Sequence, residues 1–493
     1  MIGRKQVADA IGVFNPRVFA LIGVFACMSL SGTIVNAHVY SFIAPTFGAA
    51  RELSTFLAGL AFLLIALCAL YRPRFLNARV LFVVGIVSFV VSGALMSCGA
   101  TWSNGATITL GMYLRPIASD TLALFAALSL LELEDVRQVA AVVAFAQLVD
   151  YAASPFVVEL LNPSTGPLAI AGCGLVGLGL SYRFGRGSCE RIRRGESALD
   201  LALADPSSFI APSHALFFCV FLFGLGNGYA LTLNEIDNAP QLAGMEGFVV
   251  VLVVLYLLLV RDKRQEDMLF SFSALLIMAG LMVAPLVFGF HAGSTAPNTL
   301  IHLGYETFSV LLWMVFWGIG RRSFFSFLPV VCIARMASSV GTDVGAVLGH
   351  TSNGFLPGDP FTAATFALVV AFLFFAFLWV AFRSFSFTDT INGVMELPRK
   401  AVSVHPEAPL SDGEEAGEGV DPWQERCETI ARKAGLTPRE TEIFIMMARG
   451  RNGRFIMDHF TISRNTAKSH IKHVYSKLGV HSHQELIDLA ERS

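Results

Sequence analysis

Apolar runs long enough to cross a lipid bilayer recur through the first four fifths of this chain. Examples are STFLAGLAFLLIALCALY from Ser54 and GFVVVLVVLYLLLV from Gly247. A helix needs about 20 consecutive, mainly apolar residues to span the hydrocarbon core. Only 15% of the 493 residues are charged, whereas soluble proteins carry roughly a quarter. These features predict a polytopic, all-α membrane protein rather than a soluble domain with a large core.

The positions of the apolar runs predict twelve spans, at about 18–36, 54–71, 80–99, 107–131, 137–160, 167–182, 212–233, 246–260, 268–290, 299–319, 325–349 and 361–382. With twelve spans, the basic residues in the loops between Arg4 and Arg322 all fall on one side, except Arg51. Lys and Arg concentrate in the short cytoplasmic loops of membrane proteins. We therefore expect both termini to be cytoplasmic.

The longest internal loop, from Arg183 to about Ala211, divides the spans into six plus six. In this topology the first 385 residues or so resemble the major facilitator superfamily, and the resemblance implies a central cavity between two halves. The loop after the second span, YRPRFLNARV, keeps the basic residues of the family's signature loop but lacks its Gly and Asp. This departure weighs against active transport.

After Phe387 the composition changes to ELPRKAVSVHPEAPLSDGEEAGEGVDPWQE, which is rich in Pro, Gly and acidic residues. Such a segment is typical of a flexible linker. We predict a membrane domain over residues 1–385, a flexible acidic linker over 386–430 and a separate domain over 431–493. The linker is either simply solvated or folds back to mask a basic partner.

The last domain has clear helix boundaries. Thr437-Pro438-Arg439-Glu440 combines a capping box with Pro at the first helical position, and Gly450 ends the helix that starts there. A second helix covers about 453–460, and a turn leads to Ser463, which can cap a third helix that ends at Gly479. A capping box at 482–485 opens the last helix. Four short helices with a tight turn between the second and third predict a helix-turn-helix.

The third helix has two different faces. Its apolar face comprises Ala467, Ile471, Val474 and Leu478 at helical spacing, and its polar face comprises Asn465, Lys468, Ser469 and Lys472. The domain carries 11 Lys and Arg against six Asp and Glu, although the whole chain has a net charge of −2. A basic helix face of this kind can donate to guanine edges and phosphates.

The stretches LTPRETEIFIMMARGR and TISRNTAKSHIKHVYSKLGVHSHQEL resemble the LuxR-type helix-turn-helix over about sixty residues. The resemblance implies a bacterial transcription regulator whose third helix enters the major groove of double-stranded promoter DNA. Lys468, Ser469 and Lys472 match base-facing positions, and Arg464, Asn465, Thr466 and His473 match positions near phosphates. It also implies a homodimer on DNA through the last helix, about 484–491.

Three residues depart from the LuxR pattern. Met457 stands where the family has a small Ala, Ala467 where it has Val, and Thr461 where it often has Gly. Met457 and Ala467 are interpreted as a volume-conserving exchange between the second and third helices.

Ionisable residues inside spans are costly and usually face the bundle interior or a wet cavity. The candidate ligand-binding residues are Arg115, Asp120, Asp150, Glu306 and Arg335. Three interpretations stay open: a pocket for a small molecule, an ion-pair network that fixes helix register, and residual proton coupling. The sequence does not identify the ligand.

We expect no metal site and no cofactor, and we do not expect this protein to be an enzyme. The histidines of the last domain do not follow a known metal-ligand spacing, and the chain has no C-x-x-C pair. We find no nucleophile and base pair and no phosphate-binding loop.

Two functions compete. The first is a membrane-anchored one-component transcription regulator, in the inner membrane with several spans, that senses a small molecule through its bundle and binds promoter DNA. The second is a major-facilitator-like transporter with a cytoplasmic regulatory domain. The near-complete LuxR motif and the degenerate signature loop favour the first.

Overall fold

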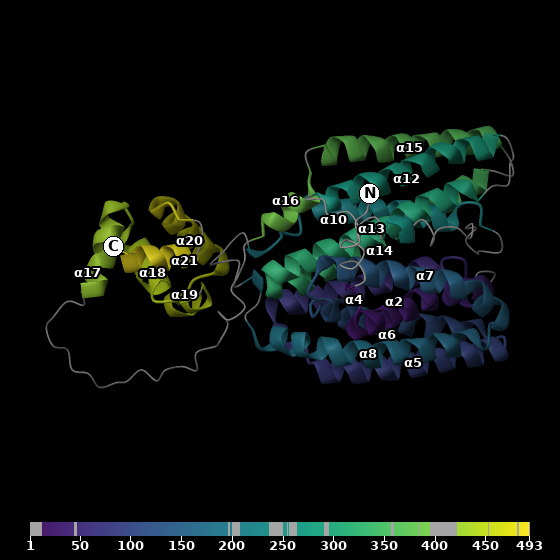
Figure 1. The fold of residues 1–493 in the computed structure, drawn as a ribbon, viewed down its shortest axis with the longest axis horizontal. Coiled ribbons are helices and arrows are strands. Elements are labelled where there is room, and N and C mark those ends of the chain that lie inside the picture. The colour runs from purple at the N-terminus through teal and green to yellow at the C-terminus, as the bar shows by residue number, and fades with distance from the viewer. Residues whose placement is uncertain are drawn as a thin grey trace.

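The computed structural model describes residues 12–43, 47–195, 198–199, 208–235, 250–253, 255, 264–289, 295–355, 359–383, 385–394, 422–451, 453–480 and 483–492. Across these residues every regular element is a helix, and no strand is present. Figure 1 shows two groups of long helices, drawn in purple to blue and in teal to green, and a group of short yellow helices near the C-terminus.

The first group of long helices forms the N-terminal half of the membrane domain. It contains α2 (Pro16–Ile34), which η1 (Val35–Tyr40) and α3 (Ser41–Ile43) continue, then α4 (Ala50–Tyr71), the short η2 (Pro73–Phe75), α5 (Ala78–Thr101), α6 (Gly105–Leu130), α7 (Val136–Leu160) and α8 (Gly166–Arg194). Helix α2 packs against α7 and α8, while α6 packs against α4, α5 and α8. Asn15, Asn77, Asn104 and Asp135 cap α2, α5, α6 and α7 through their side chains.

The second group forms the C-terminal half. Its described helices are α10 (Ala215–Thr232), α12 (Gln265–Gly289), α13 (Ala296–Arg322), α14 (Phe324–Phe355), α15 (Pro360–Phe382) and the short α16 (Phe387–Asn392). The two halves meet along two seams, where α4 packs on α14 and α7 packs on α13. Residues that bridge these two seams therefore determine how the halves fit together.

Ten of the described helices are long and apolar enough to cross a membrane, so the chain is a multi-pass membrane protein. They correspond to ten of the twelve predicted spans. The fourth predicted span is α6, which is 26 residues long and contains Pro116 but is not among the ten. The eighth, at 246–260, lies mostly outside the described residues.

The backbones of α10 and α14 lie in direct contact, because glycines on each helix face backbone carbonyl groups of the other. A Cβ atom on Gly228 would lie 1.9 Å from the Thr342 carbonyl oxygen, and one on Gly345 would lie 2.0 Å from that of Leu225. Small residues allow such close approach, which replaces the hydrophobic driving force that helices lack in lipid. The sequence analysis did not single out these glycines.

The C-terminal domain has five helices and its own hydrophobic core. They are α17 (Pro422–Lys433), α18 (Pro438–Ala448), α19 (Gly453–Phe460), α20 (Arg464–Leu478) and α21 (His483–Arg492). The last four correspond to the four predicted helices. The core includes Ile443, Phe444, Ile471 and Leu486, all at most 1% exposed.

The predicted linker over 386–430 differs from the structure at both ends. Helix α16 covers Phe387–Asn392 and packs on α12 and α13. Helix α17 starts at Pro422 and packs on α18 and α21, because Trp423, Cys427 and Ala431 recur at helical spacing and contribute to the core of the C-terminal domain. The acidic composition of the preceding segment concealed this short amphipathic pattern.

Replacing Gly345 by Ala tests the close approach of α10 and α14. We expect Gly345→Ala to destabilise the membrane domain by about 1–3 kcal/mol, since the new methyl overlaps the Leu225 carbonyl. Gly179→Ala on α8 is the matched control, because a Cβ there has no neighbour within 4 Å. The measurement is the thermal unfolding temperature of both variants in the same detergent. Equal unfolding temperatures would contradict the packing described above.

Candidate functional site

Helix α20 is fixed at both ends and along one face. The Ser463 hydroxyl accepts from the Thr466 amide at 3.2 Å, which caps the first turn. At the other end Gly479 adopts a φ of +68°, the left-handed conformation that glycine tolerates best. Ala467 and Val474 are fully buried. The predicted inward face of the third helix is therefore confirmed.

The opposite face of α20 is open to solvent. Lys468, Ser469 and Lys472, the three residues at base-facing positions, are all exposed. Among the described side chains, no carboxylate forms an ion pair with Lys468 or Lys472. Both ammonium groups are thus available to an anionic partner such as a nucleic acid.

The residues at phosphate positions are arranged less uniformly. The Thr466 hydroxyl lies 2.8 Å from that of Ser463, within the helix cap. His473 is exposed, and its Nδ1 lies 3.6 Å from Glu440 Oε1. Arg464 and Asn465 belong to the first turn of α20, but their side chains lie outside the described ones.

Glu440 connects the start of α18 to the end of α20. Its carboxylate accepts from the Thr437 amide at 2.8 Å, completing the predicted capping box, and from Lys477 Nζ at 2.7 Å. Glu440 is only 4% exposed. The Lys477 ammonium and then the Thr437 amide lower the pKa of Glu440 to about 2. Sequence reasoning found the cap but not the ion pair, because Lys477 is 37 positions away.

The turn between α19 and α20 contains a non-glycine residue in a left-handed conformation. Thr461 has a φ of +52°, and the Ile462 amide closes the turn on the Met457 carbonyl at 3.1 Å. A β-branched residue is strained there, which explains why this position is often Gly in the resembled family. Met457 is half-buried against the domain core, whereas Ala467 is fully buried.

In the membrane domain, two of the five candidate ligand residues take part in polar contacts along the seam between α7 and α13. The Thr33 hydroxyl donates to Asp150 Oδ1 at 3.1 Å, and Gln147 Nε2 donates to Glu306 Oε2. His302 Nε2 lies 3.8 Å from Glu306 Oε1. Glu306 is thus joined across the seam to Gln147, whereas the contact of Asp150 with Thr33 lies within the N-terminal half.

The other three candidate residues gather around Asp120 on α6. Asp120 is 5% exposed, and the positive charges of Arg335 on α14 and Arg115 on α6 both attract its carboxylate. Arg115 also approaches the Tyr40 hydroxyl at 3.4 Å. The two arginines, predicted to lie in different halves, therefore act on the same buried carboxylate.

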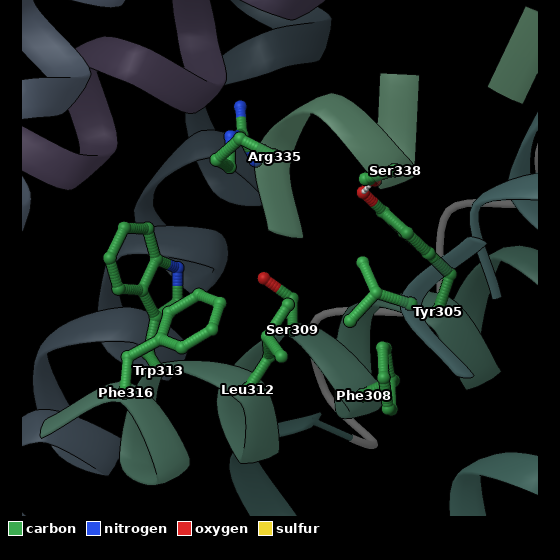
Figure 2. Close-up of a pocket in the computed structure, with 9 residues that line it drawn as sticks. Tyr305, Phe308, Ser309, Leu312, Trp313, Phe316, Arg335 and Ser338 are labelled. Carbon is green, nitrogen blue, oxygen red and sulfur yellow. Dashed lines mark hydrogen bonds between the residues drawn. The ribbon is translucent and has the colours of Figure 1, made fainter. Parts of the chain in front are cut away.

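A small cavity lies beside Arg335 in the C-terminal half, with a volume of about 10 Å³. It is lined by Val220, Tyr305, Phe308, Ser309, Leu312, Trp313, Phe316, Arg335 and Ser338. Figure 2 shows the guanidinium of Arg335 on one side of this space, with the rings of Trp313 and Phe316 and the hydroxyl of Ser309 across from it. Of the five candidate ligand residues, Arg335 is the one in the cavity wall.

The structure adds a charged cluster that sequence reasoning missed. His350 on α14 places Nδ1 2.9 Å from Glu235 and Nε2 3.2 Å from Glu52 on α4. Arg51, also on α4, lies 3.1 Å from Glu235. This cluster joins the two halves at the end of the α4–α14 seam where α4 begins. The sequence contained an indication of this cluster, since Arg51 was the only basic residue in the predicted loops on its side of the membrane.

Toward the other ends of the helices, a hydrogen bond and a cation–π contact also join the halves. Trp317 Nε1 donates to the Leu133 carbonyl at 3.3 Å, and the guanidinium of Arg191 lies 4.8 Å from the centre of the Phe324 ring. Each contact pairs a residue of the N-terminal half with one of the C-terminal half.

Comparisons with known proteins agree with this division of the chain. Residues 434–490 match the family described as "Bacterial regulatory proteins, luxR family". The chain is 45% identical over 60 residues to the transcriptional activator protein ExaE of Pseudomonas putida, and this match covers 12% of this chain and 28% of ExaE. The chain thus spans about a quarter of the length of that relative.

Among solved structures, the major facilitator superfamily proton:xylose symporter XylE, bound to 6-bromo-6-deoxy-D-glucose, is 13% identical with a TM-score of 0.52. The likeness covers 76% of this chain and 96% of XylE. A bacterial homologue of the iron transporter ferroportin is 12% identical with a TM-score of 0.49, over 74% of this chain and 99% of that one. The protein therefore combines membrane helices that share the fold of XylE with a C-terminal LuxR-type helix-turn-helix domain.

The Glu440 contacts predict a pH dependence for the C-terminal domain. Because the folded-state pKa lies below the usual 4.5, the contribution of Glu440 is complete above about pH 4.5 and is lost as the pH falls toward 2. We expect Glu440→Gln to cost about 1–3 kcal/mol at pH 7 and to flatten the acid dependence. The measurement is urea unfolding of residues 420–493 between pH 2 and 7.

Glu442→Gln is the control for that experiment, since Glu442 is 55% exposed and pairs with Arg439 on the surface. Exposed pairs contribute about 0.2–1 kcal/mol. Equal losses in the two variants would show that Glu440 does not hold α18 and α20 together.

Proposed function

We propose that this protein is a membrane-anchored one-component transcription regulator. In this proposal the membrane bundle senses a small molecule and thereby controls how the C-terminal domain binds promoter DNA. The observation that carries the proposal is the exposed face of Lys468, Ser469 and Lys472, which has no ion pair among the described side chains, on a capped helix of a LuxR-type domain. The membrane bundle is the only other folded part among the described residues, so it is the candidate sensor.

A route from the bundle to the DNA-binding domain starts at α16. The Asp267 carboxylate at the start of α12 accepts from the Phe387 amide at 2.7 Å and from the Ser386 hydroxyl at 2.9 Å. Arg322, at the end of α13, donates to Asn392 Oδ1 at 2.9 Å. These contacts fasten α16 to α12 and α13, so a movement of either helix displaces the point from which the chain continues toward the DNA-binding domain.

Aromatic packing links the same helix to the cavity. Phe308, in the cavity wall, stacks on Phe223 with ring centres 3.9 Å apart, and its ring centre lies 6.2 Å from that of Phe387. Phe270 lies 5.2 Å from Phe387. Because close-packed side chains move together, a ligand that displaces Phe308 would also displace α16.

We further propose the cellular arrangement that the proposed function needs. In this arrangement both termini lie in the cytoplasm, which the arginine-rich loops favour, and the bundle lies in the inner membrane. Helix α21 is the proposed contact between two copies on DNA, following the LuxR resemblance. Such a dimer suits two half-sites about one helical turn apart.

The alternative function is a transporter that the C-terminal domain regulates, which the fold shared with XylE favours. It requires substrate uptake by the membrane domain alone. Uptake by a version that ends at residue 394, lost in Arg115→Ala, would place transport first. The same version without uptake of sugars, amino acids or organic anions would support the regulator.

The DNA-binding face is tested with residues 420–493, which include α17 and the whole core of the C-terminal domain. We expect this fragment to bind selectively to DNA upstream of its own or neighbouring genes. Lys468→Ala/Lys472→Ala should weaken binding by at least about tenfold, since each base contact contributes roughly 1–3 kcal/mol. The measurement is fluorescence anisotropy across a salt series.

The control is Arg432→Ala/Lys433→Ala, which removes the same charge from exposed positions on α17. This variant should remain selective for the same DNA, and its affinity should change less than that of Lys468→Ala/Lys472→Ala. Equal losses in both double variants, or no selective binding at low salt where nonspecific attraction is strongest, would contradict a base-reading role for α20.

A further inference from the structure

We infer that the cavity beside Arg335 binds a small aromatic anion, such as a single-ring carboxylate. This inference deepens the proposed function and rests on it, because it names the chemical class of the signal. Three features carry it: an arginine without a hydrogen-bond partner among the described residues, a net positive charge around that arginine, and a wall of aromatic rings.

Arg335 lacks a direct polar partner in the described part of the chain. Its guanidinium lies 5.6 Å from the centre of the Phe62 ring, and no hydrogen bond or ion pair joins it to another described residue. A guanidinium has five N–H donors in a planar fork that fits a carboxylate through two parallel bonds. An arginine inside a membrane is costly unless its donors are satisfied. Arg335 therefore favours an anionic ligand.

The charges around Arg335 favour a bound anion. Arg335 and Arg115 both carry a positive charge, and Asp120 is the carboxyl group that both influence. Two guanidinium groups and at most one carboxylate leave this group with a net positive charge. A bound anion offsets positive charge in a site where an uncompensated charge costs several kcal/mol, whereas a cation would add to it.

The rest of the wall fits a flat ring with a few polar atoms. Trp313, Phe316 and Phe308 supply aromatic faces, and Phe25 holds the Trp313 ring in a T-shaped contact at 5.3 Å. Aromatic pairs in such arrangements contribute about 0.5–1.5 kcal/mol beyond their buried area. The Ser309 hydroxyl points into the cavity and can orient a ring substituent (Figure 2).

The size of the cavity explains how such a ligand acts as a signal. A volume of about 10 Å³ holds one water molecule but not a ring. Binding must therefore favour a conformation in which the aromatic wall has moved apart. A ligand shifts a conformational equilibrium only if it binds the two conformations with different affinities. Here the ligand fits only the conformation with the wider cavity, so the affinities differ.

The test uses full-length protein in lipid nanodiscs at pH 7 and isothermal titration calorimetry with three matched compounds. Benzoate has the ring and the charge, benzamide keeps the shape without the charge, and cyclohexanecarboxylate keeps the charge without the flat ring. We expect benzoate to bind at least about tenfold more tightly than either analogue, since charge-assisted bonds are roughly twice as strong as neutral ones.

Two variants separate the cavity from general effects of charge. Arg335→Gln should weaken benzoate binding by about 10- to 100-fold and leave benzamide unchanged. Arg383→Gln removes one exposed arginine outside the cavity and should change neither. The comparison of benzoate with benzamide on the native protein remains decisive if Arg335→Gln does not fold.

The outcomes distinguish this inference from the proposed function. Three results would overturn the inference that the ligand is an aromatic anion. They are equal binding of benzoate and benzamide, no binding of benzoate up to millimolar concentration, and benzoate binding that Arg335→Gln does not change. Selective DNA binding by residues 420–493 would leave the regulator standing in that case. Arg335-dependent benzoate binding without any selective DNA binding would instead retain the cavity's ligand and reject the regulator.

Discussion

Polar contacts buried between the two halves of the bundle fix the conformation on which the rest of the structure depends. Unpaired charged groups are costly in hydrocarbon, so the side chains that cross the seams hold the halves together strongly and specifically. The Arg51, Glu52, Glu235 and His350 cluster closes one end of the α4–α14 seam. Gln147 with Glu306 crosses the α7–α13 seam, and Thr33 with Asp150 joins α2 to α7 beside it within the N-terminal half. Breaking a buried pair is costly, which makes the closed bundle one of a few discrete arrangements rather than a continuum.

A bundle with discrete arrangements would suit the proposed signalling, because helix α16, the proposed output element, is attached to one half. Helix α16 is held by Asp267 and Arg322 of the C-terminal half and is packed against Phe308 of the cavity wall. The DNA-binding domain, by contrast, is internally rigid: Glu440 ties the cap of α18 to Lys477 of α20. A signal from the bundle would therefore change where α20 is presented, or to what partner, rather than how it is folded.

The sequence predicted the elements whose signals are local. Thr437, Ser463 and Gly479 marked helix ends correctly because caps depend on neighbouring residues. The pairing of Glu440 with Lys477, and of His350 with Glu52, joins residues far apart in the chain and required the fold. Helix α17 was assigned to the linker because its apolar positions follow an acidic, proline-rich stretch. In the proposed ligand site, Arg335 was found from its cost in a membrane, whereas apolar side chains of the lining such as Val220 and Phe316 had no distinguishing pattern.

The central claim is that the membrane bundle controls the DNA-binding domain through α16, and one measurement tests it most directly. Three proteins are compared for their affinity for the same promoter DNA. They are the native full-length protein in nanodiscs, the full-length variant Asp267→Asn/Arg322→Gln in nanodiscs, and the fragment of residues 420–493. The account predicts that native full-length protein differs from the fragment by several-fold and that the double variant, with α16 released, approaches the fragment. Equal affinities for all three proteins would contradict it and reduce the bundle to an anchor.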